Sequence, residues 1–195
     1  AIAEADIKKL YEKLDTLSDG DILVLAGSIP DVMPGSMYMD IMKHLQNKDL
    51  KIVVDATKDL LVNVLQYHPF LIKPNNHELG EIFGVKIGNK ADVIMYAKKM
   101  QEAGARNVLI SMAGEGAVLV SEDGQVYKSE CPKGKVKNSV GAGDSMVAGF
   151  IAGYLESGEY KEALRKGLLT GSASAFSDNL ATKQEVEELG KTFQL

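Results

Sequence analysis

The chain has 195 residues, of which 45% are hydrophobic and 25% are charged, and these values are close to the average of soluble globular domains. Its 22 Lys and Arg residues and 27 Asp and Glu residues give a formal net charge of −5, which argues against a general binder of nucleic acid or anionic membranes. The longest apolar run, 146–155, is about half of the roughly 20 residues needed to cross a bilayer, and the single Cys131 has no intramolecular disulfide partner. We therefore expect a folded cytoplasmic protein in which any phosphate site is local.

Short β-type runs alternate with helical patterns along most of the chain, and the pattern after residue 140 is helical only. In chain order, the expected elements are a helix within 1–14, a strand at 21–27, a helix near 35–48, a strand at 51–56, a helix near 58–66, a strand at 70–74, a helix from about 76, a helix near 90–103, strands at 107–112, 116–121 and 125–130, and helices at 143–156, about 160–177 and 183–189. The last three strands are joined by Gly-containing turns, which indicates antiparallel pairing. We expect a mixed sheet with an antiparallel edge in a single α/β domain, 1–195.

The continuous apolar strands "ILVLA" and "IVVDA" are typical of a parallel sheet that helices cover on both faces. Ligands of such sheets bind in the crevice outside the carboxyl ends of the strands. The segments that this rule selects are 27–30, Asp55, 73–78 and 111–116. We expect the functional groups of the protein to lie there.

The segment "NSVGAGDSMVAGF", 138–150, places a glycine turn at the mouth of a helix. The glycines permit a backbone in which the N–H groups of Ala142, Gly143 and Asp144 converge, and the helix N-terminus adds partial positive charge. This pattern predicts a cradle for a phosphate or an oxyanion. A plainer interpretation makes Asp144 an N-cap, and the two interpretations are compatible.

In "KPNNHELGEIFG", 73–84, Asn75 and Glu78 lie three residues apart at the start of a helix. An amide and a carboxylate so placed can orient the waters around Mg²⁺. The same spacing is that of a capping box, which spacing alone favours. Lys73, at a strand end, either meets a phosphate or is a solvated surface lysine.

Two further segments contain closely spaced small residues. In "SMAGEGAVLV", 111–120, Gly114 and Gly116 either permit a hairpin turn or let a flat nucleotide lie against the backbone. In "TGSASAF", Gly171 and Ala175 form a small-residue face that more often serves helix packing than a ligand.

The sequence does not match two familiar nucleotide-binding motifs or a familiar zinc-binding motif. A Walker A motif would need glycine where Glu185 precedes "GKT", and a Rossmann fingerprint would need glycine in place of Met146. A zinc helix would need a histidine in place of Glu81.

Together, these segments resemble those of ribokinase-like sugar kinases of the phosphofructokinase B family. "VGAGDSMVAGF" is similar to the family's second signature, "KPNNHEL" to its Asn-x-x-Glu segment, "SMAGEGA" to its nucleotide-side glycine turn, and "AGSIP" to its substrate-side strand end. The resemblance covers the C-terminal two-thirds of the family chain, in family order. It implies a three-layer α/β/α fold with a mostly parallel central sheet.

The resemblance also implies an activity, which is ATP- and Mg²⁺-dependent phosphorylation of a ketose phosphate. Fructose 1-phosphate, giving fructose 1,6-bisphosphate, is the leading substrate, and tagatose 6-phosphate is an alternative. The implied roles are Asp144 as catalytic base; Gly141, Ala142 and Gly143 as anion hole; Asn75 and Glu78 for Mg²⁺ through water; Lys73, Ser111, Ala113, Gly114, Glu115, Gly116, Gly171 and Ala175 for ATP; and Ser28 and Asp144 for the sugar phosphate.

The N-terminal portion of the family chain, with its first strands and its β lid, has no counterpart in this sequence. We therefore expect a fragment, a cleavage product, or one piece of a protein whose other piece is an N-terminal peptide. The expected partners are ATP and a sugar phosphate, without nucleic acid or membrane, and a homodimer is expected for the full-length protein. An ATP-binding module without catalysis of its own is the alternative, because an uncovered site admits water.

Overall fold

A computed structural model describes residues 2–193 and 195. Six strands form one sheet in the order β1-β2-β3-β4-β5-β6. They are β1 (Ile22–Ala26), β2 (Lys51–Asp55), β3 (Leu71–Ile72), β4 (Asn107–Ser111), β5 (Ala117–Val120) and β6 (Val126–Ser129). Strands β1 to β4 are parallel, while β5 and β6 are antiparallel to their neighbours. The predicted mixed sheet with an antiparallel edge is confirmed.

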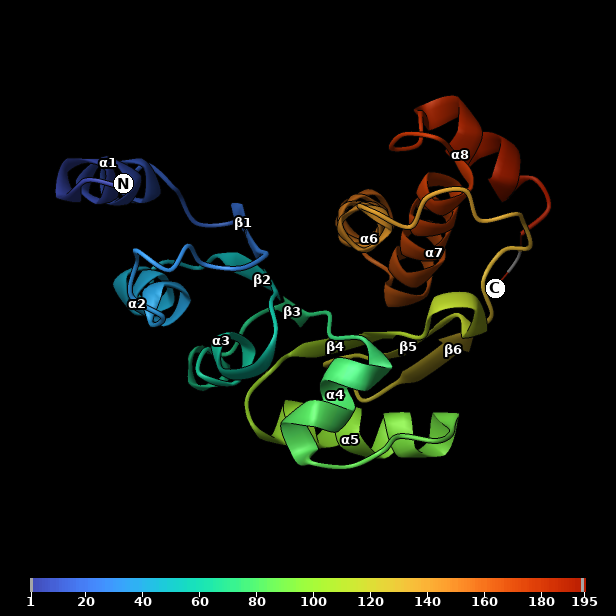
Figure 1. Cartoon of the computed structure of the whole chain (residues 1–195), viewed down its shortest axis with the longest axis horizontal. Coiled ribbons are helices and arrows are strands. Elements are labelled where there is room, and N and C mark those ends of the chain that lie inside the picture. The colour runs from blue at the N-terminus through green and yellow to red at the C-terminus, as the bar shows by residue number, and fades with distance from the viewer. Residues whose placement is uncertain (1, 194) are drawn as a thin grey trace.

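Helices cover both faces of this sheet (Figure 1). They are α1 (Glu4–Asp15), α2 (Met37–His44), α3 (Lys58–Val62), α4 (Asn76–Phe83), α5 (Lys90–Glu102), α6 (Ala142–Ser157), α7 (Tyr160–Phe176) and α8 (Lys183–Gly190), with 3₁₀ helices η1 (Leu65–Tyr67) and η2 (Ala113–Glu115). In Figure 1, α4 and α5 lie below the sheet and α6 and α7 lie above it. Within residues 2–193 and 195, every helix falls short of the length or hydrophobicity that crossing a membrane requires.

The central strands are apolar without alternation because both of their faces are buried. In β2, Ile52 and Val54 join the apolar cluster on the side of α2 to α5, while Val53 joins the cluster with α6 and α7. Side chains alternate between the faces of a strand, so successive residues of β2 serve both cores. This three-layer arrangement fixes the carboxyl ends of the parallel strands as one edge of the molecule.

The outermost strand, β1, is less completely covered. Val24 of β1 lies in register with the fully buried Val53 of β2, and therefore on the same face of the sheet, but it is 43% exposed. The α6 and α7 layer thus protects the sheet from β2 onward and leaves this part of β1 open to solvent.

Glycines allow α6 and α7 to pack closely. A Cβ atom added at Gly149 would lie 2.5 Å from Thr170 Oγ1, and one at Gly171 would lie 3.0 Å from the carbonyl oxygen of Ala142. Ser174 Oγ also donates a hydrogen bond to Ser145 Oγ at 2.8 Å across the interface. The N-terminus of α6 is therefore held in place by α7 as well as by the sheet.

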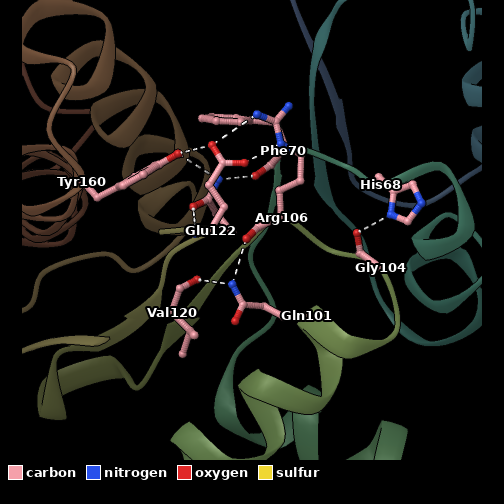
Figure 2. Close-up of polar contacts among 9 residues, drawn as sticks. His68, Phe70, Gln101, Gly104, Arg106, Val120, Glu122 and Tyr160 are labelled. Carbon is pink, nitrogen blue, oxygen red and sulfur yellow. Dashed lines mark hydrogen bonds and ion pairs between the residues drawn. The ribbon is translucent and has the colours of Figure 1, made fainter. Parts of the chain in front are cut away.

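A polar network ties the start of α7 to the amino end of β4 (Figure 2). Tyr160 Oη donates to Glu122 Oε1 at 2.5 Å, and Arg106 Nε donates to Glu122 Oε2 at 2.6 Å. Asn107 Nδ2 donates to the carbonyl oxygen of Phe70 at 2.8 Å, and its Oδ1 accepts from the backbone N–H of Glu122 at 2.9 Å. The network lies at the edge of the sheet opposite the carboxyl ends.

The network also sets the charge of Glu122. Burial by itself would raise the pKa of this carboxyl, but the hydrogen bonds from Arg106 and Tyr160 hold the pKa below its usual value. Burial and the contact with Glu122 raise the pKa of Tyr160, so its hydroxyl remains a donor. Because the pKa of Glu122 is lower in the folded state, its contribution to stability is present above the unfolded-state pKa and is lost as pH falls through the folded-state pKa.

Replacing Tyr160 with Phe removes the donor and leaves the ring in place. We expect Tyr160→Phe to lower the free energy of unfolding by about 1.5–3 kcal/mol, the usual range for a hydrogen bond to a charged group. Urea denaturation at neutral pH measures the change. The matched control is Tyr127→Phe, the same change on β6, where the hydroxyl makes no hydrogen bond among the described residues. Equal stability of the two variants would contradict the role of the network.

Candidate functional site

Four polar residues meet where β2, β3 and β4 end. Asp55 closes β2, Lys73 follows β3, and Ser111 closes β4. An isolated parallel bridge pairs Asn75 with Ser111, and the N–H of Ser111 donates to the carbonyl oxygen of Pro74 at 3.2 Å. The strand-end rule therefore selects segments that are neighbours in space.

A buried ion pair forms the centre of this edge. Lys73 Nζ lies 3.1 Å from Asp55 Oδ2, and the two side chains are only 8% and 17% exposed. A Cβ atom added at Gly143 would lie 3.2 Å from Lys73 Nζ, so the ammonium group lies directly against the turn that begins α6. Lys73 is thus not a solvated surface lysine, and it joins the sheet to the glycine turn.

The turn before α6 has the geometry that the glycines predict, with one difference. Gly141 is the N-cap of α6 and has φ +77°, a left-handed conformation that favours glycine. The amide of Ala142 donates to the carbonyl oxygen of Ser139 at 3.2 Å, so it is not available to a ligand. Among the described residues, the amides of Gly143 and Asp144 have no backbone or side-chain acceptor. The cradle consists of two amides rather than three.

Asp144 is not the N-cap of this helix. It is the third residue of α6, it is exposed, and its side chain makes no cap hydrogen bond. Among the described residues its carboxylate takes part in no ion pair. The plainer interpretation of Asp144 is therefore wrong, and the carboxylate is available beside the cradle.

The charges of this edge influence one another. Burial raises the pKa of Asp55, the ammonium group of Lys73 opposes that rise, and the carboxylates of Asp144 and Glu78 add to it. The charge of Asp55 is thus coupled to one ammonium group and to two further carboxylates.

Asn75 and Glu78 form a capping box at the start of α4. Asn75 Oδ1 accepts from the backbone N–H groups of His77 and Glu78 at 2.9 and 2.8 Å, and Glu78 Oε2 accepts from the N–H of Asn75 at 2.8 Å. The capping interpretation is thus present in the structure. The second carboxylate oxygen of Glu78 has no protein donor among the described residues.

Asn75 and Glu78 could bind Mg²⁺ only if the ion keeps most of its bound water molecules. Within the described part of the chain, no three His, Cys, Asp or Glu side chains are grouped closely enough to hold a metal ion. Asn75 Oδ1 already accepts two hydrogen bonds, so Glu78 Oε1 is the available ligand of the pair. A single carboxylate with waters and phosphate oxygens is a usual environment for Mg²⁺.

The segment after β4 is an exposed one-turn 3₁₀ helix, η2, at the same edge. Gly116, with φ +93°, ends it, and an added Cβ atom would overlap the carbonyl oxygen of Ser129 on β6. Gly116 is therefore required by the hairpin between β4 and β5. A Cβ atom at Gly114 would meet no atom within 4 Å, so its surroundings are open.

The remaining predicted site residues are placed as follows. Gly171 is buried against α6, so helix packing accounts for it. The carbonyl oxygen of Ala175 accepts from the N–H groups of Lys137 and Asn138 at 2.8 and 3.2 Å, which ties the end of α7 to the segment before the cradle. Ser28 is exposed just after β1, next to the end of β2.

A lysine, carboxylates and unpaired helix amides thus lie at the carboxyl edge of a mostly parallel sheet, which is where α/β proteins bind their ligands. The chain belongs to the pfkB family of carbohydrate kinases, whose profile matches residues 1–186.

Curated relatives of this family align over nearly the whole chain. It is 44% identical over 188 residues to a protein named 1-phosphofructokinase from Bacillus subtilis, which covers 96% of this chain and 62% of the relative. It is 32% identical over 195 residues to a D-tagatose-1-phosphate kinase from Bacillus licheniformis, covering 100% of this chain and 64% of the relative. The chain thus spans somewhat more than three-fifths of the length of these relatives.

Solved structures have the same fold. Phosphofructokinase-2 from Escherichia coli, in complex with substrates and products, superimposes with a TM-score of 0.89 at 26% identity over 95% of this chain and 61% of that one. Ribokinase from Arabidopsis thaliana, complexed with ribose and ATP, gives a TM-score of 0.74 at 19% identity, which shows the fold alone, over 89% of this chain and 56% of that one. The ribokinase-like fold expected from the sequence is confirmed.

A methyl group at position 143 tests the contact between Lys73 and the glycine turn. Gly143→Ala places a Cβ atom 3.2 Å from Lys73 Nζ, without backbone strain. We expect the affinity for ATP·Mg²⁺, used as a multiply charged phosphate probe, to fall roughly three- to tenfold because the ammonium group is displaced. Calorimetry measures it, and thermal denaturation shows that the fold is kept. Gly88→Ala is the control, since a Cβ atom there meets nothing within 4 Å. Equal affinities of the two variants would contradict the contact.

Proposed function

We propose that this chain is the nucleotide-binding and phosphoryl-transfer part of a sugar-phosphate kinase that converts fructose 1-phosphate to fructose 1,6-bisphosphate with ATP and Mg²⁺. The observation that carries the proposal is the exposed carboxylate of Asp144 beside the unpaired amides of Gly143 and Asp144 and the ammonium group of Lys73. The relatives named 1-phosphofructokinase support the choice of substrate. Because the chain spans only part of their length, the activity is proposed for the whole protein.

In this proposal, Asp144 accepts the proton of the acceptor hydroxyl as its oxygen attacks the γ-phosphorus of ATP. The bond from that phosphorus to the bridging oxygen breaks, and ADP leaves. The amides of Gly143 and Asp144 donate to the oxygens of the transferred group, together with Lys73. Phosphoryl transfer needs mainly positioning and charge stabilisation, and a weak base is sufficient.

The remaining roles follow from the positions of the side chains. Glu78 would hold Mg²⁺ through its second oxygen and water, and Asn75 would orient water or phosphate with its side-chain NH₂ group. Bound Mg²⁺ neutralises charge on the phosphates. The exposed turn Ala113–Glu115, between Ser111 and Gly116, would line the nucleotide, bordered by the end of α7 at Ala175. Gly171 would act there only indirectly, through the packing of α7 on α6. Ser28 would face the sugar phosphate.

Two alternatives are favoured by specific observations. Relatives named D-tagatose-1-phosphate kinase favour tagatose 1-phosphate, rather than tagatose 6-phosphate, as the alternative acceptor. The second alternative is an ATP-binding module that does not catalyse transfer on its own, for which the unpaired amides of Gly143 and Asp144 would be sufficient. We place the protein in the cytoplasm and propose a homodimer for the full-length form. A tetrameric inhibited form is recorded for phosphofructokinase-2 of E. coli.

Neutralising the proposed base tests the mechanism. In the whole kinase, with this chain joined to the N-terminal part that family members carry, we expect Asp144→Asn to lower kcat by about a hundredfold or more, the usual contribution of a positioned base. Steady-state kinetics with fructose 1-phosphate measures it. Asp49→Asn, at the opposite end of β2, is the control. A loss in Asp144→Asn of less than about tenfold would remove the assignment of the base.

Glu78→Gln separates metal binding from helix capping. Glutamine still accepts the N–H of Asn75 in a capping box, so we expect the melting temperature to be kept. The loss of the carboxylate charge should weaken the dependence of ATP binding on Mg²⁺, measured by calorimetry at increasing Mg²⁺. The control is Glu81→Gln, on the same helix. An unchanged Mg²⁺ dependence in Glu78→Gln would show that Glu78 only caps α4.

A further inference from the structure

Asp55 lies beside the proposed machinery without a part in it. It closes β2, its side chain is 17% exposed, and its one ion-pair partner within the described residues is Lys73. Lys73 follows the neighbouring strand β3, so the pair joins two adjacent strand ends. The ammonium group lies between the carboxylate of Asp55 and the glycine turn at Gly143.

Stability does not account for this ion pair. Removing two charges from water is costly, and apolar side chains of similar size often replace buried ion pairs without loss of stability. Burial, together with the carboxylates of Asp144 and Glu78, raises the pKa of Asp55 in spite of the attraction of Lys73. Perturbed buried charges of this kind gather at functional sites.

The geometry gives the pair a positional task. The side chain of lysine is long and flexible, so an ammonium group without a fixed partner can take up several positions. Within the described residues, Asp55 is the one carboxylate that forms an ion pair with Lys73. Without Asp55, no ion-pair partner among the described residues would hold the ammonium group beside Gly143. The contact at 3.1 Å with a carboxylate on the rigid end of β2 selects one of these positions.

We infer that Asp55 is a positioning residue, which holds the ammonium group of Lys73 against the 141–144 turn so that it meets the phosphate to be transferred. Asp55 touches neither nucleotide nor sugar and acts through Lys73. The inference rests on the proposed function, because it needs a phosphate at the turn.

Calorimetry on this chain compares the affinities of ATP·Mg²⁺ and AMP for the wild-type protein, Asp55→Asn, Lys73→Met, the double variant and the control Asp49→Asn. We expect Asp55→Asn to weaken ATP·Mg²⁺ binding by about tenfold, the effect of a lost charge-assisted hydrogen bond on the placement of Lys73. AMP, which lacks the transferred phosphate, should bind within about twofold of wild type, as both ligands should to the control. Lys73→Met and the double variant should bind ATP·Mg²⁺ equally.

Several results would overturn the inference. One is unchanged or tighter ATP·Mg²⁺ binding by Asp55→Asn, and another is an equal loss of ATP and AMP affinity, which indicates a loosened fold. If Asp55→Asn does not fold, Lys73→Met and the double variant provide the test. Weaker ATP·Mg²⁺ binding by the double variant than by Lys73→Met would show that Asp55 acts by a route other than Lys73. If the wild-type chain does not bind ATP·Mg²⁺, the proposed function fails and this inference with it, whereas differences among variants concern Asp55 alone.

Discussion

The contact of one buried ammonium group with both a strand end and a helix turn organises the proposed site. The ammonium group of Lys73 pairs with Asp55 on β2 and lies against Gly143 on α6, so it links the sheet to the helix layer. A buried charge tolerates little displacement, because each lost contact leaves it unpaired. The positions of the cradle amides relative to the strand ends therefore depend on this contact.

The two edges of the sheet have different tasks. At the amino edge, every polar group of the network around Glu122 and Tyr160 is paired, and the network fixes the start of α7. At the carboxyl edge, the carboxylate of Asp144 and two amides at the start of α6 are left without protein partners. The glycine-lined interface of α6 and α7 connects the two edges. The rigid network at the amino edge therefore supports the carboxyl edge, where polar groups are available to a ligand.

Much of the fold was predictable because the strands are continuous apolar runs and the helices have clear periodicity. The strand-end rule also selected Asp55, Lys73 and Glu78. It could not pair Asp55 with Lys73, since no local pattern links residues on different strands. The sequence left open whether Asp144 is an N-cap, because a carboxylate near a helix start is compatible with several cap positions, and only the left-handed backbone at Gly141 decides among them. The amide of Ala142 was counted as available because its acceptor, Ser139, belongs to an irregular turn.

The most direct test of this account is a crystal structure of the chain with Mg²⁺ and a non-hydrolysable ATP analogue. The account predicts a terminal phosphate oxygen at about 3 Å from the amide nitrogens of Gly143 and Asp144, with Lys73 Nζ within reach of the same phosphate and still paired with Asp55. A terminal phosphate bound away from the start of α6, or a Lys73 side chain turned away from it, would contradict the account.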